Sequence, residues 1–473
     1  MNRDRAQKVD GPLVSRNPAD PGDIVIELHG CGPDTVTGAV HRASRAQAEW
    51  LAAGAGERSA ALRRAADAVE AASEELAGLL VREVGKPLTE ARGELARTAA
   101  IWRYYAQFPY DATGAVHEPA SGPGLLLTRR RPHGVAGLIT PWNFPLAIPS
   151  WKAAPALAAG NAVLLKPAPE ATACALRLAE VLGRALPTDL LRVVPGGADV
   201  GTRLIDLADV VSFTGSTAVG AGVARAAAAR GVPVQAEMGG HNAAVVLPDA
   251  DPERAAADIA VAIAGYAGQK CTATRRVIAV GNALPHLRAA LAEALRELPA
   301  RAPHTADTVC GPVISRTALD RVVGARDGAL RSGARALAGA GARRSGPDTG
   351  WYTDPVLLEQ VPAHHELHRR ETFGPLAVLS GAADLDEAVR AANSTPYGLV
   401  TSLHTGDLDV ALAALDRLTT GMLRVNAPTT GVDFHLPFGG EKESGIGMRE
   451  QGRAALDFYT SSRTVSFLPA VPA

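Results

Sequence analysis

The sequence predicts an α/β protein with two doubly wound domains, each a parallel β-sheet covered by helices. Short apolar runs of strand type alternate with alanine-rich helical stretches from about residue 133 onward. Connections of that length favour parallel pairing of the strands. The alternation restarts after Gly239 and Gly240, which places a domain boundary there. The chain has 473 residues, which is enough for two or three domains.

The segment from about residue 34 to 107 is expected to be helical and to follow a short polar arm. Apolar residues recur in it at helical spacing, as at Leu62, Ala65 and Val69. The tripeptide Gly-Lys-Pro at 85–87 interrupts this pattern, and a second helical run follows it. We therefore expect at least two helices before the first strand.

Two alternating sets of strands and helices follow. The first has the strand-type runs GVAGLIT, NAVLLK, LLRVV and ADVVSFT, with helices over 150–159, 171–186 and 218–230. The second has NAAVVLPD at 242–249, RRVIAV, PLAVLS and GLVTSLHT, with helices over 285–298 and 384–393. No period of about 20 to 50 residues repeats along the chain, so a repeat array is not expected.

Two extended pieces, at 112–131 and 457–468, have no partner nearby in the sequence. They are expected either to pair with one another or to pair with another subunit. The segment 337–350 is rich in glycine and is expected to be a surface loop.

Composition excludes several classes of function. Hydrophobic residues make up 47% and charged residues 21%, which is typical of a globular enzyme. The formal net charge is −1, so nothing indicates a nucleic acid or an anionic membrane as partner. The polar N-terminus lacks the apolar stretch of a signal peptide, and no run of about 18 apolar residues indicates a membrane span.

The four cysteines, at 31, 174, 271 and 310, are far apart and form no Cys-x-x-Cys pair. This spacing argues against a disulfide framework and against a metal site, and it favours a reducing, cytoplasmic compartment. Cys31, Cys174 and Cys310 have no polar motif around them that indicates a role.

Cys271 differs because it lies in GYAGQKCTATRR, beside Lys270 in a chain with only six lysines. Reactive cysteines sit in polar or electropositive pockets that favour the thiolate, whereas structural ones sit among apolar neighbours. The alternative interpretation is a half-buried spectator thiol, and this window alone does not exclude it.

Two motifs indicate a nucleotide. In FTGSTAVG, Gly215 and Gly220 permit close approach of the backbone, and Ser216 begins a helix whose amides suit a phosphate. In LLKPAPE, Lys166 ends a strand where α/β sheets bind ligands, and it could contact ribose hydroxyls. The alternatives are an ordinary capped turn and a solvated lysine.

Two further motifs supply groups for acyl chemistry. In PWNFP, two prolines clamp a turn that presents Asn143, a neutral donor suited to an oxyanion. In QAEMGG, Glu237 ends an apolar run, so burial should raise its pKa and suit it to act as a base. The alternatives are an asparagine that satisfies its own turn and a salt-bridged glutamate at the domain boundary.

The last two motifs lie toward the C-terminus. In ETFGP, Glu371 could accept a hydrogen bond from a ribose, and Phe373 could contact a flat ring. The Gly/Pro-rich segment 426–447 is long enough to form a lid or a wall of a binding funnel.

In this order and at these spacings, PWNFP, KPAPE, FTGS, EMGG, GQKC, ETFGP and PFGGEKESG resemble the NAD(P)-dependent aldehyde dehydrogenase superfamily. The resemblance extends from about residue 15 to the C-terminus. Within the superfamily, PWNFPLAIPSWK, VNAPTTGVDFHLPFGGEKESG and REQGRAALDFYT look most similar to 2-oxoglutarate-semialdehyde (2,5-dioxovalerate) dehydrogenases and their bacterial relatives.

The resemblance implies that Cys271 is the nucleophile, Asn143 the oxyanion donor and Glu237 the general base. It implies cofactor contacts from Thr140, Trp142, Lys166, Gly215, Ser216, Gly220, Glu371 and Phe373. It also implies a cofactor-binding domain at 1–110 and 133–239, a catalytic domain at 240–450, and a bridging arm at 111–132 and 451–473. Such an arm implies a homodimer or a homotetramer.

The cofactor is expected to be NAD or NADP. Many NAD-preferring members carry a glutamate three residues after the lysine, where this chain has Pro169, with the acid one residue later at Glu170. A missing carboxylate removes repulsion toward a 2′-phosphate, so use of both cofactors or a lean toward NADP is expected.

The substrate is expected to be an aldehyde with a distal anion. By similarity, Arg97, Phe144, Trp151, Lys270, Thr272 and His435 line the substrate funnel. Cations in a funnel are costly unless an anion meets them, which favours a carboxylated aldehyde. The alternative is that Arg97 pairs with Glu94 or another neighbour on its helix.

Other functions remain open at this point. A CoA-acylating dehydrogenase would not need Glu237, an oxidoreductase for neutral aldehydes would not need the cations, and a non-catalytic homologue would not need Cys271.

Overall fold

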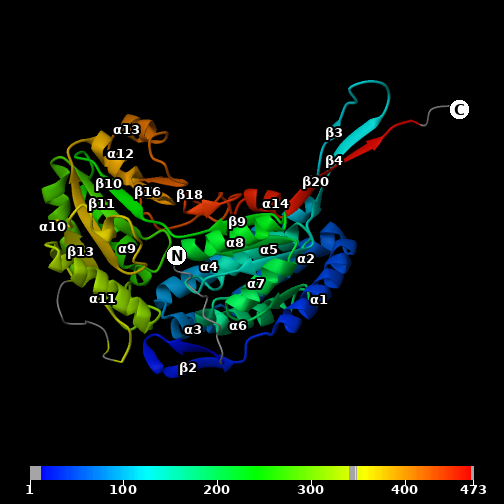
Figure 1. Ribbon diagram of the computed structural model, residues 1–473, viewed down its shortest axis with the longest axis horizontal. Helices are drawn as coiled ribbons and strands as arrows, with labels where there is room; N and C mark the ends of the chain where they lie inside the picture. The colour runs from blue at the N-terminus through cyan, green and yellow to red at the C-terminus, as the bar shows by residue number, and fades with distance from the viewer. Residues whose placement is uncertain (1–11, 112, 340–346, 348, 470–473) are drawn as a thin grey trace.

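The protein is described by a computed structural model that covers residues 12–111, 113–339, 347 and 349–469. Two mainly parallel sheets form the centres of two adjoining bodies, and a three-stranded arm projects from one of them (Figure 1). The predicted α/β class with two sheets is therefore confirmed. Most of the expected loop at 337–350 lies outside the described residues.

The N-terminal segment is a β-hairpin, so the prediction of a plain polar arm was wrong. Strands β1 (Leu13–Asn17) and β2 (Asp20–Leu28) pair antiparallel. The turn between them is stabilised because the Asn17 side chain accepts a hydrogen bond from the Ala19 amide at 3.0 Å. Leu13 and Ser15 are buried and Val14 is not, which is the alternation of a half-buried strand.

Four helices follow, as the periodicity predicts: α1 (Pro33–Ala52), α2 (Gly54–Ala71), α3 (Ser73–Val84) and α4 (Leu88–Tyr105). The Gly-Lys-Pro break separates α3 from α4. Gly85 ends α3 with a φ of 66°, a conformation that suits glycine. Pro87 directly precedes α4.

The first body contains a six-stranded sheet in the order β19-β9-β8-β5-β6-β7. Its strands are β5 (Val135–Ile139), β6 (Ala162–Lys166), β7 (Leu191–Val193), β8 (Val210–Thr214), β9 (Val234–Glu237) and β19 (Gly445–Ile446). Its helices are α5 (Ala147–Ala158), α6 (Thr172–Leu182), α7 (Ala198–Leu207) and α8 (Thr217–Ala229). Strands β5, β6, β7 and β8 and three of these helices match the expected runs, whereas β9, β19 and α7 were not expected.

The second body contains a seven-stranded sheet in the order β12-β13-β14-β11-β10-β16-β17, and only β12 runs antiparallel. Its strands are β10 (Asn242–Val246), β11 (Thr274–Val280), β12 (Arg335–Ala338), β13 (Val356–Glu359), β14 (Leu376–Ala382), β16 (Val400–His404) and β17 (Met422–Val425). Its helices are α9 (Pro252–Ala264), α10 (Ala283–Arg296), α11 (Arg316–Arg331), α12 (Leu385–Asn393) and α13 (Leu408–Ala414). Of these helices, only α10 and α12 were expected.

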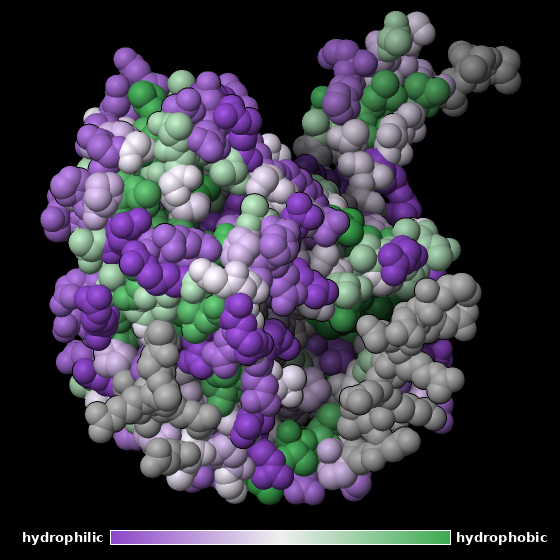
Figure 2. Space-filling model, turned by 60° about the vertical axis from the view of Figure 1, so that its left-hand side comes forward, coloured by the Kyte–Doolittle hydropathy of each residue, from purple (hydrophilic) through white to green (hydrophobic). Residues whose placement is uncertain are grey.

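The arm answers the question of the two extended pieces. Strands β3 (Val116–His117), β4 (Leu125–Pro132) and β20 (Thr460–Phe467) form one sheet in the order β20-β4-β3, so the pieces pair with one another within the chain. Helix α14 (Ala454–Phe458) leads into β20. Figure 2 shows the arm standing away from the rest of the molecule with hydrophobic side chains on its surface.

Two short strand pairings involve the segment that connects the bodies. The strand β15 (Tyr397–Gly398) pairs with β18 (Glu441–Lys442), and β19 leaves the end of the second body to pair with β9 of the first. The segment between β17 and α14 therefore runs along the junction of the two bodies (Figure 1).

Candidate active site

The expected cofactor residues gather at one edge of the first sheet. The chain moves outward from β5 through β6 to β7 on one side and through β8 to β9 on the other, so the order of strands reverses between β5 and β8. Ligands of open α/β sheets bind at such a reversal, beyond the carboxyl ends of the strands. Thr140 follows β5, Lys166 ends β6, and Gly215 follows β8.

Three polar groups at this edge have hydrogen-bonding capacity to spare. The Oγ1 of Thr140 is buried without a partner in the described structure. Lys166 is only 7% exposed, and its Nζ donates to the carbonyl of adjacent Pro167 at 2.9 Å. Burial lowers the pKa of Lys166, and the nearby carboxylates of Glu170 and Asp199 partly restore it. Ser216 is the exposed N-cap of α8 and makes no side-chain capping bond.

The two glycines of FTGSTAVG serve the protein's own packing. A Cβ at Gly215 would lie 2.5 Å from the ring of Phe213, and one at Gly220 would lie 2.6 Å from Sδ of Met238. Gly220 therefore lets α8 approach the sheet closely. A ligand was expected to approach the backbone at Gly220. The side chains of Phe213 and Met238 occupy the space beside Gly220 instead.

The opposite wall of the crevice comes from the second body. The ring of Phe373 meets the ring of Trp142 edge-on, with 5.7 Å between their centroids. Glu371 lies against Gly239, where a Cβ would come within 2.4 Å of Oε2. Burial raises the pKa of Glu371 to about 7, although Arg275 opposes the shift. The glycine pair of QAEMGG is thus explained, because Gly239 makes room for this carboxylate.

The candidate nucleophile lies on a strained turn after α9. Tyr266 and Ala267 both have positive φ, 53° and 51°, which is costly for residues other than glycine. Hydrogen bonds hold the turn: Tyr266 Oη donates to the carbonyl of Val84 at 2.9 Å, and Gln269 accepts from the amide of Ile314 at 2.8 Å. The sulfur of Cys271 is thereby carried on a rigid loop.

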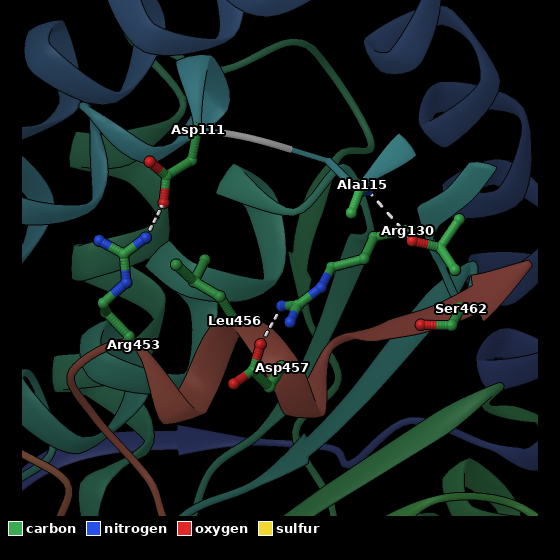
Figure 3. A pocket seen from close by; sticks show the side chains of 9 residues that line it. Asp111, Ala115, Arg130, Arg453, Leu456, Asp457 and Ser462 are labelled. Atoms are coloured by element: carbon green, nitrogen blue, oxygen red, sulfur yellow. Dashed lines mark hydrogen bonds and ion pairs between the residues drawn. The ribbon is translucent and has the colours of Figure 1, made fainter. Parts of the chain in front are cut away.

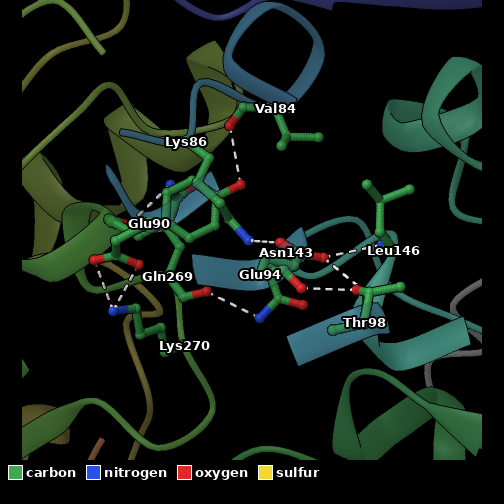
Figure 4. A network of polar contacts seen from close by, with 11 residues as sticks. Val84, Lys86, Glu90, Glu94, Thr98, Asn143, Leu146, Gln269 and Lys270 are labelled. Atoms are coloured by element: carbon green, nitrogen blue, oxygen red, sulfur yellow. Dashed lines mark hydrogen bonds and ion pairs between the residues drawn. The ribbon is translucent and has the colours of Figure 1, made fainter. Parts of the chain in front are cut away.

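Asn143 is joined to this loop. Its Nδ2 donates to the carbonyl of Gln269 at 2.9 Å, across 126 residues of sequence, and its Oδ1 is buried without a partner (Figure 4). The alternative of an asparagine satisfying its own turn is therefore not observed. An NH₂ group has two hydrogens, so the bond to Gln269 orients Nδ2 and leaves one hydrogen for a ligand.

The surroundings of Cys271 differ from the electropositive pocket that the sequence indicated. Burial raises the pKa of Cys271 to about 12, and the carboxylates of Glu371, Glu237 and Glu450 add to the shift. Lys270 does not compensate them, because its Nζ pairs with Glu90 at 2.8 Å. The resting sulfur is consequently a thiol.

Glu237 ends β9 and is 3% exposed. Burial raises its pKa well above the ordinary value, and the charge of Glu450 contributes. The backbone amide of Gly440 donates to Oε2 at 3.3 Å, and a Cβ at Gly439 would lie 2.4 Å from Oε1. The glycine pair of PFGGEKESG therefore leaves space for the carboxyl group of Glu237. The buried carboxyl group expected from the sequence is observed.

A second buried carboxylate, Glu450, escaped the sequence interpretation. It accepts hydrogen bonds from Trp151 Nε1 at 2.6 Å and from Nζ of Lys152. Lys152 also donates to Ser212 at 2.7 Å, and its charge acts on Glu237. The scarcity of lysine is a signal that could have indicated Lys152, one of six lysines, which lies at the end of PWNFPLAIPSWK.

Arg275 was also missed. Its guanidinium is buried and donates to the carbonyl of Gly268 at 2.6 Å and to that of Gly374 at 2.5 Å. It lies 3.6 Å from Glu371. One arginine therefore joins the loop that carries Cys271 to the loop that carries Glu371 and Phe373.

A cavity of about 500 Å³ opens beside Cys271. Its lining includes five of the six expected substrate residues, namely Arg97, Phe144, Trp151, Lys270 and Thr272. His435 is exposed and is not part of the lining, so the expectation for it was wrong. The segment 426–447 supplies Pro428, Thr430, Gly431, Val432 and Phe438, as expected for a funnel wall.

Two ion pairs neutralise part of this lining (Figure 4). Lys270 pairs with Glu90, so the expectation of a free cation at Lys270 was wrong. Glu94 pairs with buried Lys86 and accepts from the amides of Leu146 and Ala147 at 2.9 and 3.0 Å. Glu94 therefore does not pair with Arg97, which has no hydrogen bond or ion pair within the described ranges.

The whole described arrangement has close counterparts among known proteins. The model of the aldehyde dehydrogenase family matches residues 6–465. The chain is 37% identical over 475 residues to the alpha-ketoglutaric semialdehyde dehydrogenase of Bacillus subtilis, covering 99% of this chain and 97% of the relative. The chain belongs to the aldehyde dehydrogenase family.

Solved structures of the family agree with this fold. The NAD-dependent aldehyde dehydrogenase of Sinorhizobium meliloti superposes with a TM-score of 0.93 at 32% identity, over 99% of this chain and 94% of that one. The NADP-dependent glyceraldehyde-3-phosphate dehydrogenase of Bacillus halodurans, complexed with NADP, gives 0.91 at 30% identity over 98% and 96%. This aldehyde dehydrogenase is an oxidoreductase that uses NAD or NADP.

The crevice of this aldehyde dehydrogenase fits such a cofactor. Its edge offers the orphaned hydroxyl of Thr140, the buried ammonium of Lys166 and the uncapped amides after Ser216. These are donors and acceptors for ribose hydroxyls and for a pyrophosphate at a helix N-terminus. The Oε1 of Glu371 is likewise buried without a hydrogen-bond partner.

Two kinds of feature are absent from the described residues. No group of three or more histidine, cysteine, aspartate or glutamate side chains there could hold a metal ion. No helix in the same residues is long and apolar enough to cross a membrane.

Proposed function

We propose that this aldehyde dehydrogenase oxidises an aldehyde with a distal anion to a carboxylic acid, through a covalent intermediate on Cys271. The observation that carries the proposal is the position of Cys271. The thiol lines the cavity of about 500 Å³, the carboxylates of Glu237 and Glu371 act on it electrostatically, and Asn143 is hydrogen-bonded to Gln269 of the same loop. A nucleophile, a neutral donor and a desolvated base are the groups that acyl chemistry requires.

In the first step the sulfur of Cys271 attacks the aldehyde carbon and a tetrahedral thiohemiacetal forms. The thiol proton must leave during the attack, because the pKa of about 12 keeps the resting sulfur protonated. This proton passes to solvent through the cavity that opens beside the sulfur, so the step does not require Glu237. The free hydrogen of Asn143 Nδ2 and the backbone N–H of Cys271 then stabilise the oxyanion.

The nicotinamide cofactor, when bound, supplies the acceptor for the hydride that the tetrahedral carbon expels. Loss of the hydride leaves a thioester on Cys271. Glu237 then removes a proton from water, which attacks the thioester and releases the acid. Burial suits Glu237 to this role because a raised pKa makes a carboxylate a stronger base.

The substrate class rests on charge. Arg97 lines the cavity without a carboxylate partner in the described structure, so an anionic group on the substrate would form an ion pair with it. The Bacillus subtilis relative is named for a semialdehyde, an aldehyde with a carboxylate at its other end. We therefore expect a higher kcat/KM for carboxylated aldehydes than for neutral ones.

Cofactor choice is expected to be dual. A glutamate at the position of Pro169 would repel the 2′-phosphate of NADP, and this chain lacks that glutamate. The carboxylates of Glu170 and Asp199 nevertheless interact electrostatically with Lys166. These opposing features favour neither cofactor strongly. A preference of more than about a hundredfold for either cofactor in kcat/KM, about 2.7 kcal/mol, contradicts dual use.

The arm supports a homo-oligomer. Four hydrophobic side chains on it are exposed: Val116 at 73%, Leu125 at 44%, Phe467 at 58% and Leu468 at 67% (Figure 2). Exposure of this kind is typical of an interface between subunits. At the base of the arm, ion pairs of Arg453 with Asp111 and of Arg130 with Asp457 line a polar hollow that a second copy could cover (Figure 3). The free cysteines fit a reducing, cytoplasmic location.

The test is acid formation by Cys271→Ser and Glu237→Gln, measured without CoA and with a carboxylated aldehyde. The serine variant should lose activity, and the glutamine variant should accumulate a thioester that mass spectrometry detects on the intact protein. Cys31→Ser, a half-exposed thiol away from the site, is the matched control. Full turnover by Cys271→Ser, or a product that requires CoA, contradicts the proposal.

A further inference from the structure

The substrate cavity holds a second unpaired arginine, Arg424. It lies on β17, the edge strand of the second sheet, and it is half-buried. It lines the same cavity as Cys271 and Arg97. Unlike Lys270, it forms no ion pair with any described carboxylate.

The position of Arg424 is fixed from one side only. Its Nη1 donates to the carbonyl of Gly431 at 2.7 Å, and Gly431 belongs to the loop that lines the cavity. Its Nε is buried and has no hydrogen-bond partner in the described ranges. A guanidinium has five N–H donors, so a single carbonyl leaves most of this group unsatisfied.

The charges of the lining can be balanced group by group. Glu90 is compensated by Lys270, and Glu94 by Lys86. Two guanidiniums remain, Arg97 on α4 of the first body and Arg424 on β17 of the second. Both are partly desolvated, and a desolvated cation without an anion is unfavourable.

We propose that Arg424 is a specificity-determining residue of this enzyme, which with Arg97 binds one carboxylate at the far end of the aldehyde substrate. The two guanidiniums come from opposite bodies, so a shared carboxylate also bridges the junction of the bodies. Arginine suits this role because its planar group donates paired hydrogen bonds to a carboxylate. This inference rests on the proposed function, which supplies the aldehyde and the thiol.

A purely structural role for Arg424 is the competing explanation. The bond to Gly431 could serve only to hold the loop, in which case Arg424 would influence all substrates equally. The place of Arg424 in the cavity lining argues against this, because a guanidinium that only anchored the loop would not need to lie beside Arg97 without a carboxylate partner in the described structure.

The experiment compares kcat/KM for succinate semialdehyde with that for butanal, which has the same chain length and no charge. It uses Arg424→Met, Arg97→Met and the double variant, with Arg417→Met as the matched control. Arg417 is 37% exposed and pairs with Asp386 on the surface. The measured quantity is the ratio of the two kcat/KM values, which cancels general effects on the catalytic machinery.

Each single substitution should lower this ratio by about 10- to 150-fold, the loss expected for one charged hydrogen-bonding partner. The double variant should lose less than the product of the single losses, because both arginines hold the same carboxylate. Arg417→Met should leave the ratio within about twofold of the wild type. An unchanged ratio in Arg424→Met, or losses that multiply in the double variant, overturns the inference.

A binding measurement separates this inference from the proposed function. Glutarate, a dicarboxylate that cannot be oxidised here, should raise the thermal midpoint of the wild type, and the rise should disappear in Arg424→Met. If the wild type oxidises no aldehyde, the proposed function fails while this readout still tests the anion site. If glutarate stabilises Arg424→Met as much as the wild type, the anion site is refuted whatever the activity.

Discussion

The buried pair of Lys86 and Glu94 offers the sharpest test of how the fold holds the site. Both side chains are fully inaccessible to solvent. The ammonium of Lys86 also lies 3.7 Å from the centroid of the Phe144 ring. Glu94 accepts hydrogen bonds from the backbone amides of Leu146 and Ala147, three and four residues after Asn143 in the chain. We consider the substitution Glu94→Gln, which keeps an oxygen for those amides and removes the charge.

The cost of Glu94→Gln can be bounded from two directions. Removing one partner of a buried ion pair typically costs about 3–5 kcal/mol, because the other charge stays buried and uncompensated. Lys86 can escape by losing its proton, and burial already lowers its pKa. At pH 7 that loss costs about 4–5 kcal/mol relative to an ordinary lysine of pKa about 10.4. We therefore expect a destabilisation of about 3–5 kcal/mol.

Deprotonation of Lys86 makes the destabilisation caused by Glu94→Gln depend on pH. If Lys86 is neutral in the folded variant and charged when unfolded, the unfolded state binds one more proton. Stability of the variant relative to the wild type then rises with pH, by about 1.4 kcal/mol per unit between pH 7 and 9. Urea unfolding at these pH values, followed by tryptophan fluorescence, measures both the cost and the slope.

The matched control is Lys86→Met in the Glu94→Gln background, where no buried ammonium remains and the slope should vanish. The single variant should also lower kcat with a neutral aldehyde, because the turn that presents Asn143 loses a charged anchor. A cost below about 1 kcal/mol at pH 7, or a cost that does not change with pH, would show that the pair does not carry an uncompensated charge as argued.

Three further predictions concern the catalytic groups. The rate at which iodoacetamide alkylates Cys271 should rise about tenfold per pH unit from pH 7 to 10, because the pKa of the thiol is about 12. Glu237→Gln removes a nearby carboxylate and should raise this rate at any one pH. A rate that levels off near pH 9 contradicts this prediction. Glu371 has a folded pKa of about 7, so it stabilises the fold when protonated, and that contribution is lost as the pH rises from about 4.5 to 7. In urea unfolding, the free energy of unfolding of Glu371→Gln should decrease by about 3 kcal/mol less than that of the wild type over this pH range. The same pH dependence in the variant and the wild type refutes this prediction. Gly439→Ala would place a methyl group 2.4 Å from Oε1 of Glu237 and displace this base. The rate of acid release should then fall about 100-fold, and stopped-flow absorbance should show a burst of reduced cofactor. Acid release at the wild-type rate contradicts this prediction.

The strands and the site loops could be predicted because local sequence determines them. Runs such as NAVLLK and ADVVSFT have consecutive apolar residues at their centres, which is the pattern of strands buried on both faces. Once the strands were assigned, the rule for open α/β sheets placed Thr140, Lys166 and Gly215 at one edge, and the structure has them there.

The charge state of the site could not be predicted, because partners lie far apart in the sequence. Lys270 is neutralised by Glu90, which is 180 residues away, and the sequence shows no sign of that pairing. Glu450 reaches Lys152 across 298 residues. The thiol was therefore expected among cations, whereas the fold surrounds it with carboxylates.

The N-terminal hairpin was missed for a different reason. Its first strand has only five residues, and the turn at Pro18 and Ala19 also suits an irregular arm. Only the contact with the rest of the fold decides between these, and Ser15 makes it by donating to the buried carboxylate of Glu83 at 2.6 Å. Tertiary contacts of this kind override weak local signals.

The distribution of charge gives the site a direction. Three carboxylates, those of Glu237, Glu371 and Glu450, act electrostatically on Cys271, which lines the cavity. Two unpaired guanidiniums, Arg97 and Arg424, line the same cavity. A substrate with an aldehyde at one end and a carboxylate at the other meets repulsion if its charged end approaches the sulfur and attraction if it faces the arginines. In a partly desolvated cavity these two effects add, so we expect the charges to favour the orientation in which the aldehyde faces Cys271. A neutral aldehyde lacks that handle and must rely on the shape of the cavity, which is why substrate charge, more than chain length, should separate good substrates from poor ones.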